Sequence, residues 1–177
     1  MSEIAITGLA ELQKALDQLP EKLQRNVLRG ALRQGAKVQL ARARALAPVA
    51  DPSGRNKAEF KGYAGALRDS LRISTSTRGG IVRSHVTAGT SKTNKLPYYA
   101  VMVERGTAAH FIKPKHRKSL FFAGLNREVI HHPGAKKKPF MRPALDGTVQ
   151  AAGAAIAAYL RRKLEKEGLD VPDAENR

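Results

Sequence analysis

The sequence contains no cysteine and no tryptophan, and only 5% of its 177 residues are aromatic. The absence of cysteine excludes disulfide bonds and thiolate metal sites. Acidic residues are few, fifteen against thirty-two lysines and arginines, which leaves a formal net charge of +17. Because a field of that sign attracts polyanions and acidic protein surfaces, the charge informs on partners rather than on fold.

Long hydrophobic runs are missing as well. The longest apolar stretch, residues 151–160, is mostly alanine and too short to span a bilayer. The first seven residues lack the basic and apolar regions of a signal peptide. We therefore expect a soluble protein of a reducing compartment that makes no membrane contact. A chain of this length most often forms one domain that buries roughly 70% of the surface its unfolded form exposes.

Apolar residues at helical spacing predict three main helices. Leucines recur at intervals of three and four over residues 9–19. A longer helix is predicted for residues 21–46, between two prolines. Residues 145–164 repeat the pattern in a last helix, which Pro143 opens and Gly168 stops.

Strand patterns occupy the middle of the chain. Residues 71–77 and 81–88 predict a hairpin joined by Arg78-Gly79-Gly80. The apolar segment 98–103 fits a helix or a strand equally well. Residues 120–123 and 129–132 predict a second hairpin around Gly124-Leu125-Asn126.

The order of helices and strands predicts an α+β fold. In it, the long N-terminal helix and the C-terminal helix pack on an antiparallel β-sheet with extended loops. Residues 1–168 are expected to form a single domain, and 169–177 an acidic flexible tail. The loop 49–64 is polar and contains proline and glycine.

Basic residues gather on one side of the predicted long helix. Four of them follow a strict i, i+4 row, so they repel one another unless a partner neutralises them. A solvated helix face is the competing interpretation. A second basic run is either a solvated loop or a socket for an acidic neighbour. The predicted contacts with DNA or an acidic partner are Arg25, Arg29, Arg33, Lys37, Arg44, Lys136, Lys137 and Lys138.

Patterns typical of catalysis are scarce. The sequence has no glycine-rich phosphate-binding loop and no histidine spacing typical of zinc, so no metal or cofactor is expected. Glu104 is the one carboxylate within a motif-like stretch, and a structural ion pair is more common there than a general base. We therefore predict that the chain is not an enzyme. Any contact with DNA would be to the backbone, because no aromatic residues interleave with the basic clusters to stack on bases.

Several short motifs follow one another along the chain. They are Ala47-Pro48, Gly65-Ala66-Leu67-Arg68-Asp69-Ser70-Leu71, Tyr99-Ala100, Glu104-Arg105-Gly106-Thr107, His132-Pro133-Gly134 and Lys138-Pro139-Phe140-Met141-Arg142-Pro143-Ala144-Leu145. Together they resemble the neck or tail-completion proteins of long-tailed bacteriophages, also described as phage morphogenesis proteins or minor tail components. The loop 49–64 is longer and more charged than is usual in that family.

The resemblance implies a structural virion protein without enzymatic activity. It implies a ring, sixfold in symmetry, around the DNA path at the head–tail junction or the end of the tail. Other neck, connector and tail-tube proteins would be its partners, and assembly would take place in the bacterial cytoplasm. The motif residues expected to serve assembly are Gly65, Leu67, Ser70, Tyr99, Glu104, Gly106, Thr107, His132, Pro133, Gly134, Pro139, Phe140, Met141 and Pro143.

Several of these positions have a role that is readable from their chemistry. Gly106 suits a turn that a side chain would obstruct, and Thr107 can bond the local backbone. Glu104 is expected to pair with a nearby arginine. Phe140 and Met141 are apolar and are expected to pack either in the subunit's own core or against a neighbouring subunit. In the alternative interpretation, the chain is a free protein that binds nucleic acid without sequence specificity.

Overall fold

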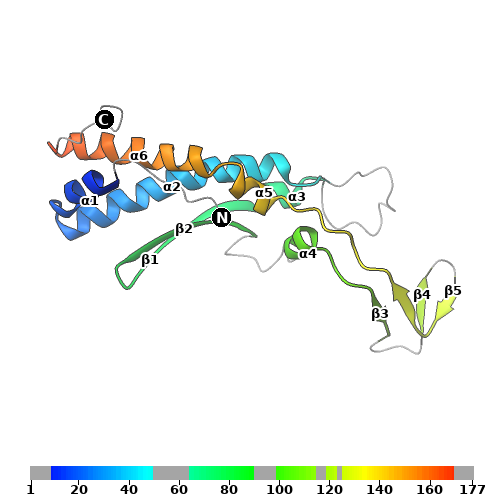
Figure 1. The fold of residues 1–177 in the computed structure, drawn as a ribbon. Coiled ribbons are helices and arrows are strands. Elements are labelled where there is room, and N and C mark those ends of the chain that lie inside the picture. Colours follow the sequence, from blue (N-terminus) through cyan, green and yellow to red (C-terminus); the bar gives the residue numbers. More distant parts are fainter. Residues whose placement is uncertain (1–8, 50–63, 90–98, 115–118, 123–124, 170–177) are drawn as a thin grey trace.

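The computed structural model describes residues 9–49, 64–89, 99–114, 119–122 and 125–169. The fold is α+β, as predicted, with an elongated body of helices and a projecting ribbon of short strands (Figure 1). The predicted acidic tail and most of the loop 49–64 lie outside the described residues. In chain order the elements are α1 (Leu9–Asp17), α2 (Glu21–Leu46), α3 (Ala66–Ser70), β1 (Leu71–Arg78), β2 (Ile81–Ala88), α4 (Ala100–Arg105), β3 (His110–Ile112), β4 (Leu120–Phe122), β5 (Leu125–Arg127), β6 (Ile130–His132), α5 (Met141–Asp146) and α6 (Val149–Lys166).

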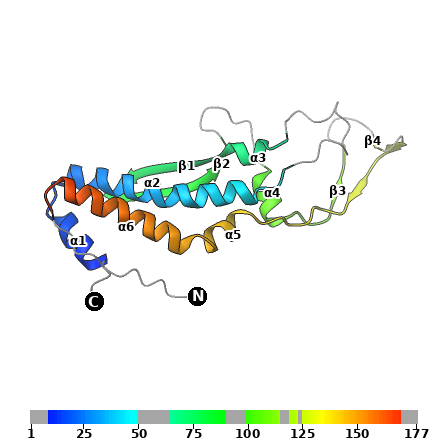
Figure 2. The same cartoon turned by 90° about the horizontal axis from the view of Figure 1, so that it is seen from above.

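Helices α2 and α6 lie side by side along the length of the body (Figures 1 and 2). Two glycines of α2 allow this close approach. A Cβ atom at Gly35 would lie 2.7 Å from Cδ1 of Ile156, and one at Gly30 would overlap the ring of Tyr159. At Gly35 the backbone carbonyl oxygen of Ala152 would also lie 3.2 Å from the added atom, so this glycine permits the close approach of the two helices, whereas a side chain at Gly30 would displace the end of the Tyr159 side chain.

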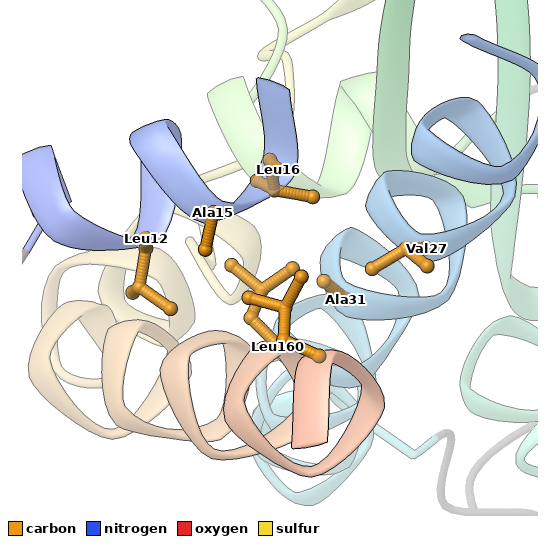
Figure 3. Packing of buried hydrophobic residues seen from close by; sticks show 7 residues of the cluster. Leu12, Ala15, Leu16, Val27, Ala31 and Leu160 are labelled. Carbon is orange, nitrogen blue, oxygen red and sulfur yellow. The ribbon is translucent and has the colours of Figure 1, made fainter. Parts of the chain in front are cut away.

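The hydrophobic core is divided between the two ends of this helix pair. At one end α1 covers α2 and α6, and Figure 3 shows Leu12 and Leu16 gathered with Val27, Ala31 and Leu160. At the other end Phe140 and Leu71 are fully buried between α2, α3 and α5. The first cluster consists of Leu12, Ala15, Leu16, Val27, Ala31, Leu160 and Leu164, and the second of Ala43, Ala47, Leu67, Leu71, Phe140 and Ala144.

The hairpin β1–β2 has the predicted position and packs against α2. Its register pairs Arg78 with Ile81, so Gly79-Gly80 forms a two-residue loop. Both glycines have positive φ, 56° and 76°, as a type I′ turn requires. The twist of that turn matches the twist of the flanking strands, which is why the sequence pattern predicts this hairpin well.

The second predicted hairpin is wrong in its pairing. Residues 120–122 pair with 125–127, not with 129–132. Strand β6 instead pairs with β3, with His110 opposite His132 and Ile112 opposite Ile130. This pairing closes a longer loop than a local hairpin, and spacing along the sequence gives no signal for it.

The single last helix predicted from Pro143 onwards is also wrong, because it is divided into α5 and α6. The break falls at Gly147-Thr148, where the hydroxyl of Thr148 donates a 2.6 Å hydrogen bond to the carbonyl of Ala144. Helix α5 begins at Met141, and Pro143 occupies its first turn, where the missing N–H group costs nothing.

The stop at Gly168 is confirmed in detail. Gly168 has φ +75° and its N–H donates to the carbonyl of Glu165, while Leu169 N–H donates to that of Leu164. These two bonds form a Schellman motif, which satisfies carbonyls at the end of α6. No described helix is long and apolar enough to cross a lipid bilayer.

Candidate functional site

An arm, defined here as residues 106–139, projects from the body and carries the ladders β3–β6 and β4–β5 (Figures 1 and 2). None of its described side chains belongs to either core cluster. Phe111 is 67% exposed, and Ile112 and Val129 are exposed as well. Two-stranded ladders without a packed face are marginally stable in water. The position of the arm therefore depends mainly on how its root is held by the body.

Glu104, at the end of α4, anchors the root of the arm to the body. One carboxylate oxygen accepts hydrogen bonds from the N–H groups of Phe140 (2.7 Å) and Met141 (3.0 Å). The other accepts one from Arg142 N–H at 3.0 Å. These amides are the unsatisfied donors at the start of α5, so Glu104 caps that helix from 36 residues away.

This arrangement corrects the predicted ion pair between Glu104 and an arginine. Among the described residues the partners of the carboxylate are backbone amides, and the Arg142 side chain bonds Asp146 instead, at 3.2 Å. Partial burial raises the pKa of Glu104, but the three amide hydrogen bonds and the nearby Arg105 lower it by more. The resulting pKa lies below that of an ordinary glutamate.

The two chain segments that enter and leave the arm are joined just beyond this cap. Thr107 and Ala135 form an antiparallel bridge with N–H···O distances of 3.0 and 3.2 Å, and Thr107 Oγ1 accepts a further bond from Ala135 N–H at 2.9 Å. Lys138 N–H donates to the carbonyl of Val103 at 2.8 Å. The predicted bonding of Thr107 to backbone is thus present, although its partner is distant in sequence.

Glycine is required on both sides of this bridge. Gly106 has φ +75°, and a Cβ atom there would lie 2.6 Å from the carbonyl oxygen of Ala135. Gly134 has φ +83°, and its Cβ atom would overlap the carbonyl oxygen of Thr107. A side chain at either position would separate the two strands of the root.

The histidines of the arm help to fix its turns. Gly134 N–H donates to Nδ1 of His132 at 3.0 Å, and Nδ1 of His110 donates to the carbonyl of Ala108, also at 3.0 Å. The two imidazole rings lie 5.0 Å apart across the β3–β6 ladder. Together with Pro133, these contacts set the direction of the chain as it returns to the root.

The remaining motif residues belong to the body. Leu67 is buried in the same core cluster as Phe140, and Tyr99 packs against that cluster. The hydroxyl of Ser70 donates to the carbonyl of Leu67 at 2.6 Å. Gly65 is buried, with φ +95°, at the start of α3. Phe140 therefore fills its own subunit's core, while Pro139 and Pro143 beside it are exposed.

The predicted basic residues lie on two separate elements. Arg29, Arg33 and Lys37 are exposed on α2. Arg25, partly buried, lies 3.6 Å from Glu21, and Nη2 of Arg44 donates to the carbonyl of Leu71 at 2.8 Å. The lysines 136–138 are exposed on the returning strand of the arm root.

A groove of about 900 Å³, which the sequence does not predict, lies between α2, β2, α4 and α5. It is lined by Ser84, His85 and Val86 of β2, and Arg105 contributes to it from α4. The side chains that line it come from segments distant in sequence, so spacing along the chain gives no signal for it. Within the described ranges, no group of three or more histidine, aspartate or glutamate residues is placed to hold a metal ion.

An arm of little internal packing is fastened to the body by the Glu104 cap, the Thr107–Ala135 bridge and two glycines, an arrangement that suits a structural protein. The chain matches, over residues 10–106, the family described as "Bacteriophage HK97-gp10, putative tail-component". Since the match covers more than half of its residues, the chain belongs to this family of phage tail components. No curated protein and no solved structure matches it.

Proposed function

We propose that this tail component is a neck or tail-completion subunit that forms a closed ring, sixfold in symmetry, at the head–tail junction or the tail end. In such a ring each copy makes the same head-to-tail contact with the next. Connector and tail-tube proteins of the virion would adjoin it, and DNA would pass through the lumen. The subunit is proposed to act by assembly alone, without catalysis or cofactor, after synthesis in the host cytoplasm.

The observation that carries this proposal is the arm. Its Phe111, Ile112 and Val129 remain partly exposed and belong to neither core cluster, whereas its root is fixed by hydrogen bonds from both chain segments. A fixed root with an apolar, unpacked end fits a contact with a neighbouring copy better than a free surface. The remaining motif residues would act indirectly, by holding the arm in position.

Light scattering over a concentration series at moderate salt, with negative-stain images of the largest species, tests this proposal. We expect closed rings whose symmetry the images determine. Phe111→Ser is expected to weaken assembly at least about tenfold, since a buried aromatic contact contributes about 1.5–3 kcal/mol. Ser76→Ala, at an exposed position of the hairpin, is the control. A strict monomer would contradict self-assembly.

The alternative function, non-specific binding of nucleic acid, rests on the exposed basic row of α2. Arg29, Arg33 and Lys37 lie one turn apart on a single exposed face of the helix. We expect that duplex binding by the isolated chain, if this is the function, falls steeply with salt, and that the triple charge reversal to glutamate abolishes it. Binding that is insensitive to both changes would exclude this face as the DNA contact.

A further inference from the structure

The hairpin β1–β2 has an open edge. In the part of the chain that the structure describes, β2 pairs with β1 alone. An edge strand of eight residues presents unpaired N–H and C=O groups that can pair with another chain, and proteins usually cover or disrupt such edges. The free edge of β2 (Ile81–Ala88) therefore requires an explanation.

The groove described above follows this edge. Ser84, His85 and Val86 all line it. Successive residues of a strand point to opposite faces, so three in a row can border one groove only along the edge of the strand. The groove thus gives an extended segment access to the unpaired backbone of β2.

The chemistry of the groove favours an apolar segment with an acidic residue. Ala43 and Ala144 are buried beside it, and Met141 and Leu145 of α5 also line it. Its cations are Arg105, Lys137 and Arg142, of which Arg142 is bonded to Asp146. The carboxylate of Glu104 is engaged by the amides of α5, which leaves the charge of the groove positive.

Residues 2–7 of the chain, Ser-Glu-Ile-Ala-Ile-Thr, match this chemistry and lie outside the described residues. Ile4 and Ile6 fall on one face of an extended strand, and isoleucine and threonine favour that conformation. Glu3 provides one negative charge. Six extended residues span about 20 Å, which fits within the eight residues of β2.

We propose that residues 2–7 of one copy add as a third strand to the open edge of β2 in a neighbouring copy. Ile4 and Ile6 enter the groove there, and Glu3 meets its cations. Backbone hydrogen bonds supply affinity in this mode of recognition, and the side chains supply specificity. The inference rests on the proposed function, because the neighbour is another subunit of the same assembly.

The position of α1 argues for pairing between copies. Figure 2 shows α1 and the hairpin on opposite sides of the α2–α6 pair. Since each helix with its side chains is about 10 Å wide, a strand from the same subunit would spend most of its roughly 20 Å reach passing around the helices. A second copy meets no such obstacle.

Disulfide trapping tests the inference in the intact chain, because the natural sequence has no cysteine. One variant carries Ala5→Cys, and the other carries Ser84→Cys, His85→Cys or Val86→Cys, so that either register is sampled. After mixing and mild oxidation, we expect a mixed dimer in at least about tenfold excess over the control mixture of Ala5→Cys with Thr77→Cys, because disulfides form only between closely placed Cβ atoms. Thr77 is exposed on β1, away from the groove.

Equal yields from the test and control mixtures would overturn the inference. So would a double variant, Ala5→Cys with His85→Cys, that closes only a disulfide within one chain. Light scattering of the same samples shows whether closed rings form, so failure of the strand inference can be distinguished from failure of the ring proposal. If closed rings form without the specific cross-link, the ring proposal stands and the added strand is excluded. If the cross-link forms without closed rings, the added strand stands and the ring proposal is excluded.

Discussion

Replacing Phe140 by alanine is expected to destabilise the protein by about 3–5 kcal/mol, the usual cost of removing a fully buried phenylalanine. Phe140 has no exposed surface and packs with Leu67, Leu71 and Ala144 where the arm returns to the body. The cavity would lie directly at the start of α5. Urea or thermal unfolding measures the change in the free energy of unfolding.

Phe111 provides a matched control for this substitution. It has the same side chain but is 67% exposed, so Phe111→Ala should change the stability of the monomer by no more than about 0.5 kcal/mol. Phe140→Leu, which retains most of the apolar volume, should have an effect between the two. Equal effects at positions 111 and 140 would contradict the packing described for the root of the arm.

Replacing Glu104 by alanine is expected to cost about 2–3 kcal/mol, because it leaves three N–H groups at the start of α5 without their acceptor. Glu104→Gln retains one carbonyl oxygen and should cost less. Glu128→Ala, at an exposed carboxylate of the arm, is the control. Hydrogen exchange should show faster opening at residues 140–142 in the Glu104 variants and unchanged exchange in the control.

The contribution of Glu104 should depend on pH with a definite sign. Its pKa in the folded protein is lower than in the unfolded chain, so its stabilisation is fully present above the unfolded value of about 4.5. It is lost as pH falls through the lower, folded value. The stability difference between the natural chain and Glu104→Ala should therefore be largest near neutral pH and shrink below about pH 4. If the stability difference between the two proteins stayed constant as the pH fell below about 4, the charge of the Glu104 carboxylate would not be the source of the stabilisation.

Local patterns predict the parts of the fold that local interactions determine. The long helix α2 has the predicted bounds because leucines and alanines define one face and prolines flank it. The hairpin β1–β2 is equally clear, since Gly79-Gly80 supplies the two positive φ angles of its turn. Gly106 was similarly expected at a turn, and its positive φ agrees with that.

Contacts between distant segments were not predictable in the same way. The partner of Glu104 is 36 residues away and is backbone, which carries no sequence signature. The pairing of β3 with β6 competes with a nearer and equally plausible hairpin. At the break between α5 and α6 the backbone of Thr148 leaves the helical conformation, with φ −124° and ψ 5°, and helical periodicity does not reveal this change.

The joining of both chain segments at Thr107 and Ala135 has a consequence for how this protein can diversify. A loop whose ends are already held together gains length cheaply, at about 0.6 kcal/mol for each doubling. Insertions or deletions beyond the bridge therefore leave the two hydrophobic clusters and the helix pair unaffected. Changes in the length or charge of the tip therefore need no compensating change in the residues of the body.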